Sequence, residues 1–177
     1  TDAVHPGDNE LTVSVIDQTA PSQTLGKQSL QPKGIYYTRV SGIWQTVWLE
    51  DVPDRHFHMV KMKPRIAEGT LRVLPTLEGK PFEAERIVIT VRDGERVVGI
   101  ADAALSVRIP DAKLWSPQSP SLYDITMELF DGEELVDCVE SYAAMREVGT
   151  VRGPAGQIRM TLNGKVVFHY GTLDQGW

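Results

Sequence analysis

The sequence predicts an all-β protein, and three observations lead to this fold class. Apolar and polar residues alternate with a period of two in several short runs, including residues 9–17, 87–91 and 105–109. Dipeptides that suit tight turns, Asp93-Gly94 and Asp131-Gly132, follow strand-like runs. No segment of helix length carries an amphipathic pattern. Together these features favour antiparallel strands joined by short turns.

Residues 1–52 contain strand-like runs joined by a long polar loop, residues 18–34. The last run, residues 43–50, places Trp44 and Trp48 on one side of a strand and apolar residues on the other. Because both sides are bulky and apolar, we expect both to be covered. The tryptophans then serve as packing at a domain seam.

Two further parts follow along the chain. In residues 53–148 about seven short strands recur every ~8–12 residues, which is typical of an immunoglobulin-like sandwich. In residues 149–177 the sequence pattern predicts one hairpin around Asn163-Gly164. An isolated two-stranded hairpin is only marginally stable, so we expect it to belong to a structure that continues beyond residue 177.

The composition is that of a globular protein with an acidic balance. Of the 177 residues, 41% are hydrophobic and 24% are charged, and the formal net charge is −6. Nucleic-acid-binding proteins usually present a basic face, so we expect no nucleic-acid partner. No apolar run approaches the ~20 residues that span a bilayer, and residues 1–10 lack the pattern of a signal peptide. We therefore expect no membrane partner.

Possible metal ligands are few. Cys138 is the single cysteine, and a small buried thiol is favoured over a nucleophile. His56 and His58 lie in an alternating run, so both imidazoles should point the same way, a geometry that can bind zinc. A metal site needs a third ligand and an orienting partner, and the sequence supplies no ligand at a fixed spacing. We interpret the pair as surface histidines on an edge strand and predict neither a metal site nor a cofactor.

No catalytic constellation is evident. Carboxylates cluster at the predicted strand ends and turns, where they are usually solvated: Glu50, Asp51, Asp54, Glu133 and Glu134. The nucleophile pattern G-x-S-x-G and the phosphate-binding glycine loops are absent from the sequence.

Two Ser-Pro pairs make residues 113–125 a rigid loop between strands. Trp115 precedes the pairs and Tyr123 follows them. These aromatic side chains could stack on a ligand, but we favour a role in covering the end of the sandwich core.

Four segments carry a resemblance to a known family. Residues 5–17 resemble the late strand of a jelly-roll sugar-binding domain, and residues 41–52 resemble the strand that closes it. Residues 113–129 contain the Leu-Trp-Ser-Pro and Pro-x-Leu-Tyr pattern of an immunoglobulin-like domain. Residues 142–177 resemble the passage into a TIM barrel, with an arginine, a Leu-Asn-Gly-Lys turn and a first barrel strand. In this order the segments resemble glycoside hydrolase family 2, the family of β-galactosidases, β-glucuronidases and β-mannosidases.

The resemblance implies that this chain is a fragment of a retaining, β-galactosidase-like enzyme of carbohydrate metabolism. It would comprise the end of the jelly roll (residues 1–52), the immunoglobulin-like domain (residues 53–148) and the start of the barrel (residues 149–177). The family's two catalytic glutamates lie on later barrel strands, and no residue here occupies either motif. We expect the fragment to be inactive alone, with the barrel of the same chain as its partner and carbohydrate bound by the full-length enzyme.

The resemblance also suggests two groups of substrate-binding residues. In some members a jelly-roll loop reaches over the barrel, and at that place this sequence has Tyr36, Tyr37 and Arg39. Asp174 and Gln175 follow the predicted first barrel strand, at the rim where barrel enzymes bind substrate. For both groups a purely structural role is the competing interpretation.

Two other functions stay open: a stand-alone carbohydrate-binding or adhesion module, and a structural spacer. Strands that lack partners expose edges, which favours association with another chain. Bacterial members of the family are often periplasmic or extracellular, but no residue of this sequence indicates a compartment.

Overall fold

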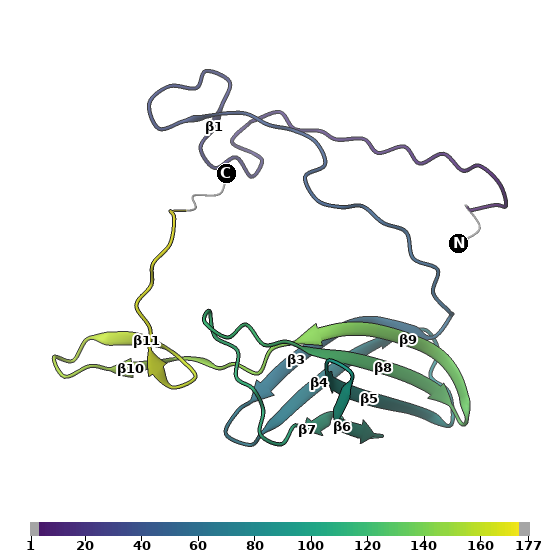
Figure 1. Cartoon of the computed structure of the whole chain (residues 1–177). Helices are drawn as coiled ribbons and strands as arrows, with labels where there is room; N and C mark the ends of the chain where they lie inside the picture. The colour runs from purple at the N-terminus through teal and green to yellow at the C-terminus, as the bar shows by residue number, and fades with distance from the viewer. Residues whose placement is uncertain (1–3, 174–177) are drawn as a thin grey trace. The chain divides into compact units, whose positions relative to one another are not determined.

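The computed structural model describes residues 4–173, and every regular element in this range is a β-strand (Figure 1). No helix there is long and apolar enough to cross a membrane. The chain divides into two compact units. The first comprises Thr1–Leu49 with Tyr170–Trp177, and the second comprises Glu50–His169.

Seven strands of the second unit form two antiparallel sheets (Figure 1). One sheet has the order β3-β4-β7 and the other has the order β6-β5-β8-β9. The predicted run of seven short strands is thereby confirmed. The strands are β3 (His56–Arg65), β4 (Thr70–Glu78), β5 (Glu85–Asp93), β6 (Arg96–Asp102), β7 (Ser106–Arg108), β8 (Tyr123–Asp131) and β9 (Glu134–Ala143).

Alternate residues of both sheets form one apolar core. In β8 every second side chain from Tyr123 to Leu129 is buried, as the pleat of a strand covered on one face requires. Full burial of a Val, Leu or Ile side chain stabilises a fold by ~1.5–3 kcal/mol, so this cluster is the main source of stability in the second unit. It contains Phe57, Leu71, Val73, Ile89, Val91, Ala101, Val107, Ile109, Tyr123, Ile125, Met127, Leu129, Ala143 and Met145.

A β-bulge near the start of β3 changes which residues face this core. Phe57 pairs with Leu77 and is buried, but the register then shifts before Met59 pairs with Thr76. His58 is the extra residue. As a result His58 and Met59 are both exposed, and the inward positions continue at Val60.

The second unit ends in a small three-stranded sheet of β10 (Val148–Arg152), β11 (Ile158–Leu162) and β12 (Lys165–Val166). The predicted hairpin around Asn163-Gly164 is confirmed as the β11–β12 connection. Strand β10 was missed because all of its residues are exposed, so it shows no apolar alternation.

The first unit contains two short strands, β1 (Gln28–Ser29) and β2 (Tyr37–Thr38), paired in parallel. The predicted strands at residues 9–17 and 43–50 are wrong for this structure, which assigns no strand to either segment. A strand needs a neighbour for its backbone hydrogen bonds, and alternation alone does not supply one. Trp44 and Trp48 are 72% and 70% exposed in this structure, so their covering at a domain seam stays a prediction.

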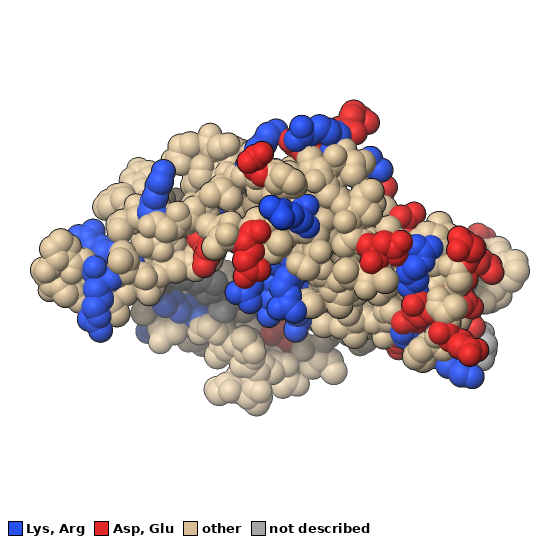
Figure 2. Space-filling view, turned by 90° about the horizontal axis from the view of Figure 1, so that it is seen from below, with Lys and Arg blue, Asp and Glu red and all other residues tan. Residues whose placement is uncertain are grey.

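Charges of both signs adjoin over much of the face in Figure 2, and Asp and Glu gather toward its right end. Two surface ion pairs are Arg86 with Asp102, at 3.0 Å, and Lys113 with Asp93, at 2.6 Å. Exposed pairs of this kind contribute at most ~1 kcal/mol each.

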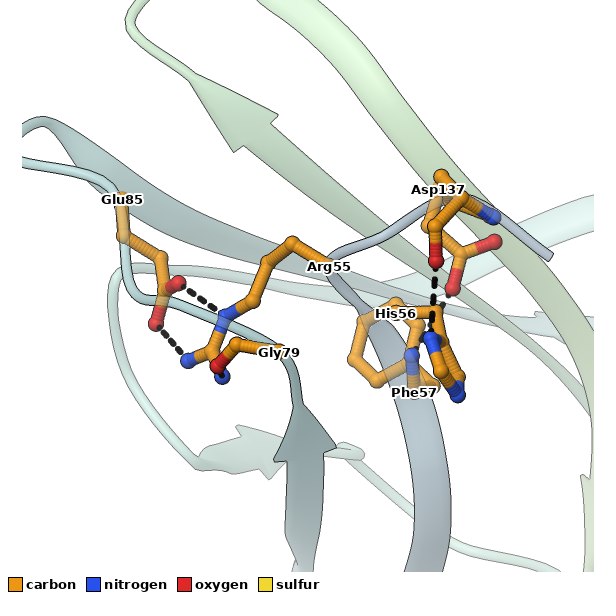
Figure 3. Close-up of polar contacts among 7 residues, drawn as sticks. Arg55, His56, Phe57, Gly79, Glu85 and Asp137 are labelled. Atoms are coloured by element: carbon orange, nitrogen blue, oxygen red, sulfur yellow. Dashed lines mark hydrogen bonds and ion pairs between the residues drawn. The ribbon is translucent and has the colours of Figure 1, made fainter. Parts of the chain in front are cut away.

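One ion pair is different because it is largely buried. The Nε and Nη2 atoms of Arg55 donate hydrogen bonds of 2.7 and 2.8 Å to the two carboxylate oxygens of Glu85 (Figure 3). Nη1 donates to the carbonyl oxygen of Gly79 at 2.9 Å. Gly79 has φ +88°, and a Cβ atom there would overlap the Asp54 carbonyl oxygen, so this turn requires glycine. The pair thus fixes the start of β3 against the β4–β5 connection.

We expect Glu85→Gln to lower the free energy of unfolding by ~1.5–3 kcal/mol at neutral pH, the usual contribution of hydrogen bonds to charged groups. The hydrogen bonds from Arg55 hold the pKa of the Glu85 carboxyl below its ordinary value. The pair therefore stabilises the fold fully above the ordinary glutamate pKa of about 4.3, and this stabilisation is lost as the pH falls through the lower folded-state value.

Urea unfolding of both proteins at pH 7 and pH 3 measures this effect. The difference between them should shrink at the lower pH. Glu133→Gln, in the exposed β8–β9 turn, is the matched control and should change stability little at either pH. A Glu85→Gln difference that is the same at both pH values would contradict the assignment.

Candidate functional site

A hollow of about 460 Å³ lies within the first unit. Its walls come from three stretches of chain, near residues 15–17, 24–28 and 40–44. The lining residues are Val15, Asp17, Thr24, Gln28, Val40, Ser41, Gly42, Ile43 and Trp44.

Two side-chain hydrogen bonds hold these walls together. Ser41 Oγ donates to Asp17 Oδ2 at 2.9 Å, and the Val40 amide donates to Gln28 Oε1 at 2.8 Å. Each bond joins residues far apart in the sequence. They fix the 40–44 segment against the loop that contains β1, although this segment has no strand partner.

The hollow combines an aromatic ring with polar groups. Trp44 offers a large exposed ring, and Asp17, Gln28 and Thr24 offer a carboxylate, an amide and a hydroxyl. An apolar surface beside a few convergent hydrogen-bonding groups is the usual composition of a small-molecule site. A sugar suits this mixture, because one face of its ring can stack on an indole while its hydroxyls bond to polar groups.

Of the predicted substrate-binding residues, the three that the structure describes, Tyr36, Tyr37 and Arg39, do not line this hollow. Tyr36, Tyr37 and Arg39 are exposed, and Tyr37 lies in β2, where its amide donates to the Lys27 carbonyl at 2.8 Å. Asp174 and Gln175 lie outside the described residues, so their proposed role stays a prediction.

Asp17 and Gln28 were missed by the sequence reasoning. Neither belongs to a recognisable motif, and only the folded loop brings them next to the Val40–Trp44 wall.

Cys138 was predicted to be buried, and this prediction is wrong. It is exposed in β9 and not buried, because β9 is an edge strand and the Cys138 side chain is on its outer face. Partial desolvation, followed by the charges of Glu128, Glu140 and Asp137, raises the pKa of its thiol. The thiol is therefore disfavoured as a nucleophile.

The two histidines of β3 do point the same way. His56 Nε2 and His58 Nδ1 lie 3.9 and 3.3 Å from the same oxygen of Glu78. Glu78 ends β4, the strand paired with β3, so the third polar group that the sequence did not supply comes from the neighbouring strand.

A junction of backbone and side-chain contacts joins the small terminal sheet to the sandwich. Leu114 forms an isolated bridge with Met145, and the Trp115 amide donates to the Met145 carbonyl at 2.9 Å. Asn163 Nδ2 donates to the Trp115 carbonyl at 3.0 Å, and Asn163 Oδ1 accepts from the Glu147 amide at 2.9 Å.

The same junction contains a cation–π contact, with the Arg146 guanidinium 4.8 Å from the centre of the Trp115 ring. It therefore brings together three patterns noted in the sequence: Leu-Trp-Ser-Pro, the arginine and Leu-Asn-Gly-Lys. Tyr123, predicted to cover the core, is buried within it at 2% exposure. Its hydroxyl accepts a 2.7 Å hydrogen bond from the Lys113 amide.

The fold and these sites define an all-β protein with two sheets around one core and a small additional sheet fixed to it. Residues 62–146 match the model of glycosyl hydrolases family 2.

Similarity to curated proteins extends over most of the chain. A β-galactosidase of Halalkalibacterium halodurans is 27% identical over 93% of this chain, and a β-galactosidase of Streptococcus thermophilus is 27% identical over 97%. A putative β-glucuronidase of Formosa agariphila is 22% identical over 82%. The chain covers only 16% to 18% of the length of these three proteins.

Solved structures show the same fold. A β-glucuronidase from Ruminococcus gnavus aligns with a TM-score of 0.57 and 16% identity, over 67% of this chain and 20% of that one. An FMN-binding β-glucuronidase from Faecalibacterium prausnitzii L2-6 aligns with a TM-score of 0.52 and 24% identity, over 64% of this chain and 19% of that one.

We expect Asn163→Gly to loosen the terminal sheet without unfolding the sandwich. Asn163 has φ 51°, which glycine adopts freely, so the substitution removes two side-chain hydrogen bonds without adding backbone strain. Each bond contributes ~0.5–1.5 kcal/mol. Amide hydrogen exchange should accelerate in β11 while the amides of Val91 and Leu129 stay protected.

Asn163→Asp is the matched variant. It keeps the oxygen that accepts from the Glu147 amide but sets a second carboxylate oxygen against the Trp115 carbonyl, so exchange in β11 should accelerate here too. Unchanged exchange in β11 of Asn163→Gly, or an equal acceleration throughout the sandwich, would show that Asn163 does not join the two parts.

Proposed function

We propose that this chain is the non-catalytic accessory region of a family 2 glycoside hydrolase that cleaves O-glycosidic bonds with retention of configuration. The observation that carries the proposal is the family match of residues 62–146, together with similarity to β-galactosidases over more than nine-tenths of the chain. The role of the region is to position a catalytic barrel and to contribute part of the substrate cleft.

Within this proposal residues 53–148 are an immunoglobulin-like sandwich. The three- and four-stranded antiparallel sheets support this assignment. So does Tyr123, a buried tyrosine at the start of β8 whose hydroxyl bonds back to the backbone ten residues upstream. This arrangement resembles the tyrosine corner of immunoglobulin-like domains. Residues 1–52 are then the end of a jelly roll, and residues 149–177 lead into the barrel.

The junction at Trp115 and Asn163 supports the positioning role. It anchors β11 and β12 to the sandwich just before the chain continues toward residue 173. The first strand of a barrel that follows β12 would therefore begin at a position fixed relative to the sandwich. Asp174 and Gln175 would then face the rim of the barrel, and Tyr36, Tyr37 or Arg39 could reach the sugar from the first unit.

The hollow of the first unit does not support hydrolysis by this chain alone. Asp17 is the one carboxylate among its described lining residues, whereas retaining glycosidases use two carboxyl groups about 5–5.5 Å apart. The described lining therefore does not contain the two carboxyl groups that would serve as nucleophile and as acid/base.

We expect the purified chain to release no product from aryl β-galactoside, β-glucuronide or β-mannoside above a protein-free blank. The parent protein should in contrast contain ~250 further residues of alternating strands and helices beyond residue 177, which its gene sequence will reveal. Turnover by the chain alone that follows the protein through gel filtration would contradict the accessory role.

The hollow favours a second candidate function, a carbohydrate-binding module. Titration with galactose, mannose and glucuronate, followed by NMR, should then shift the Trp44 indole N–H and the Gln28 side-chain amide. Trp44→Ala should weaken the binding roughly three- to tenfold, the range expected for losing one aromatic contact.

Trp48→Ala is the matched control, because Trp48 is equally exposed but does not line the hollow. Shifts that persist in Trp44→Ala and vanish in Trp48→Ala would place the sugar elsewhere. Absence of any shift in the unmodified chain would favour a purely structural region.

A further inference from the structure

The outer face of the sheet at the start of β3 gathers two imidazoles and one carboxylate. One ligand atom from each of His56, His58 and Glu78 lies within 4.8 Å of the other two. Glu78 Oε2 lies 3.9 Å from His56 Nε2 and 3.3 Å from His58 Nδ1.

Strand pairing produces this arrangement. His56 is directly opposite Glu78 in the β3–β4 register, so the two side chains share a face. Phe57 points into the core, and His58, the bulge residue, points outward beside His56. Two side chains of one strand and one of its neighbour therefore converge on a single point.

The backbone beneath the cluster is held on both sides. Arg55, which precedes His56, donates to the carbonyl of Gly79, which follows Glu78, at 2.9 Å. The Phe57 amide donates to the Asp137 carboxylate at 2.8 Å (Figure 3). The positions of the three side chains relative to one another are thus set by bonds outside the cluster, which is how ligand sets are preorganised.

The orientation of His56 is also fixed. Its Nδ1 lies 2.8 Å from the Pro53 carbonyl oxygen. A carbonyl oxygen can only accept, so Nδ1 carries the proton and the lone pair is on Nε2, the atom nearer Glu78. Metal-binding histidines are commonly oriented by such a bond from the second ring nitrogen to a backbone carbonyl.

We propose that His56, His58 and Glu78 form a zinc-binding site with one coordination position left to solvent. Two imidazoles and a carboxylate are a ligand set that zinc takes, with bonds of about 2.0–2.2 Å. Tetrahedral ligands at these distances lie ~3.3 Å apart. The side chains of His58 and Glu78 are about 60% exposed, so small rotations bring the ligand atoms to this spacing.

The surroundings favour a cation. His58 also lines a hollow between β3 and β9 whose other charged members are Glu50, Asp51, Asp137 and Glu140. Negative groups around a site raise the local concentration of cations. Mg²⁺ and Ca²⁺ prefer all-oxygen ligands, so the two imidazoles select against them.

Isothermal titration of the metal-free 177-residue chain with zinc chloride tests the site. We expect one zinc per chain, and chemical-shift changes confined to the imidazoles of His56 and His58 in NMR spectra. His58→Ala and Glu78→Gln should each weaken zinc binding at least tenfold, the smaller end of the 10–100-fold losses seen when only an outer partner is removed. Both residues are exposed, so both variants should fold. Magnesium chloride should give no binding.

His5→Ala and His169→Ala are matched controls, since these remaining histidines are exposed and distant in sequence. Cys138→Ser tests the thiol that lines the adjoining hollow. All three should bind zinc as the unmodified chain does. No binding by the unmodified chain, unchanged binding by His58→Ala and Glu78→Gln, or loss of binding in any control would overturn the proposal. In the first case the cluster is an ion pair between histidine and glutamate and holds no metal.

Discussion

The buried guanidinium of Arg55 is the interaction on which much of the second unit depends. A buried charge is costly unless it is fully paired, and here all three of its bonding nitrogens have acceptors on the β4–β5 side. Because the arginine cannot leave this pocket cheaply, the chain must begin β3 at one place and in one register. The burial of Phe57, the position of the bulge and the meeting of His56 with Glu78 follow from that register.

The position of the small terminal sheet depends on contacts with Trp115. Its carbonyl accepts from Asn163, and its amide and ring contact the adjacent residues Met145 and Arg146. Sequence patterns that look unrelated along the chain are therefore parts of one joint. A joint built from backbone groups tolerates change elsewhere in the terminal sheet, where most side chains are exposed. This explains how a small sheet with little core of its own can keep a defined position on a larger one.

The sequence was sufficient for the all-β class, the seven strands and the turn at Asn163-Gly164, because burial imposes alternation and tight turns impose residue types. It was insufficient where structure depends on pairing. The runs at residues 9–17 and 43–50 alternate but have no strand beside them. The approach of Glu78 to the histidines and of Asp17 to Trp44 depends on register and loop closure, which no single segment encodes. Cys138 was misjudged because apolar character does not distinguish the two faces of an edge strand.

The bulge in β3 has a consequence for solubility. β3 borders its sheet, and an unpaired border can be extended by a strand from another molecule, which is how many proteins begin to aggregate. Here the bulge increases the local twist of the backbone, and Pro64 has no amide N–H to donate to an added strand. Lys61 and Lys63 would also repel the same lysines of an identical strand. The irregularity that turns Met59 outward therefore also protects the molecule from growing into a fibre along this border.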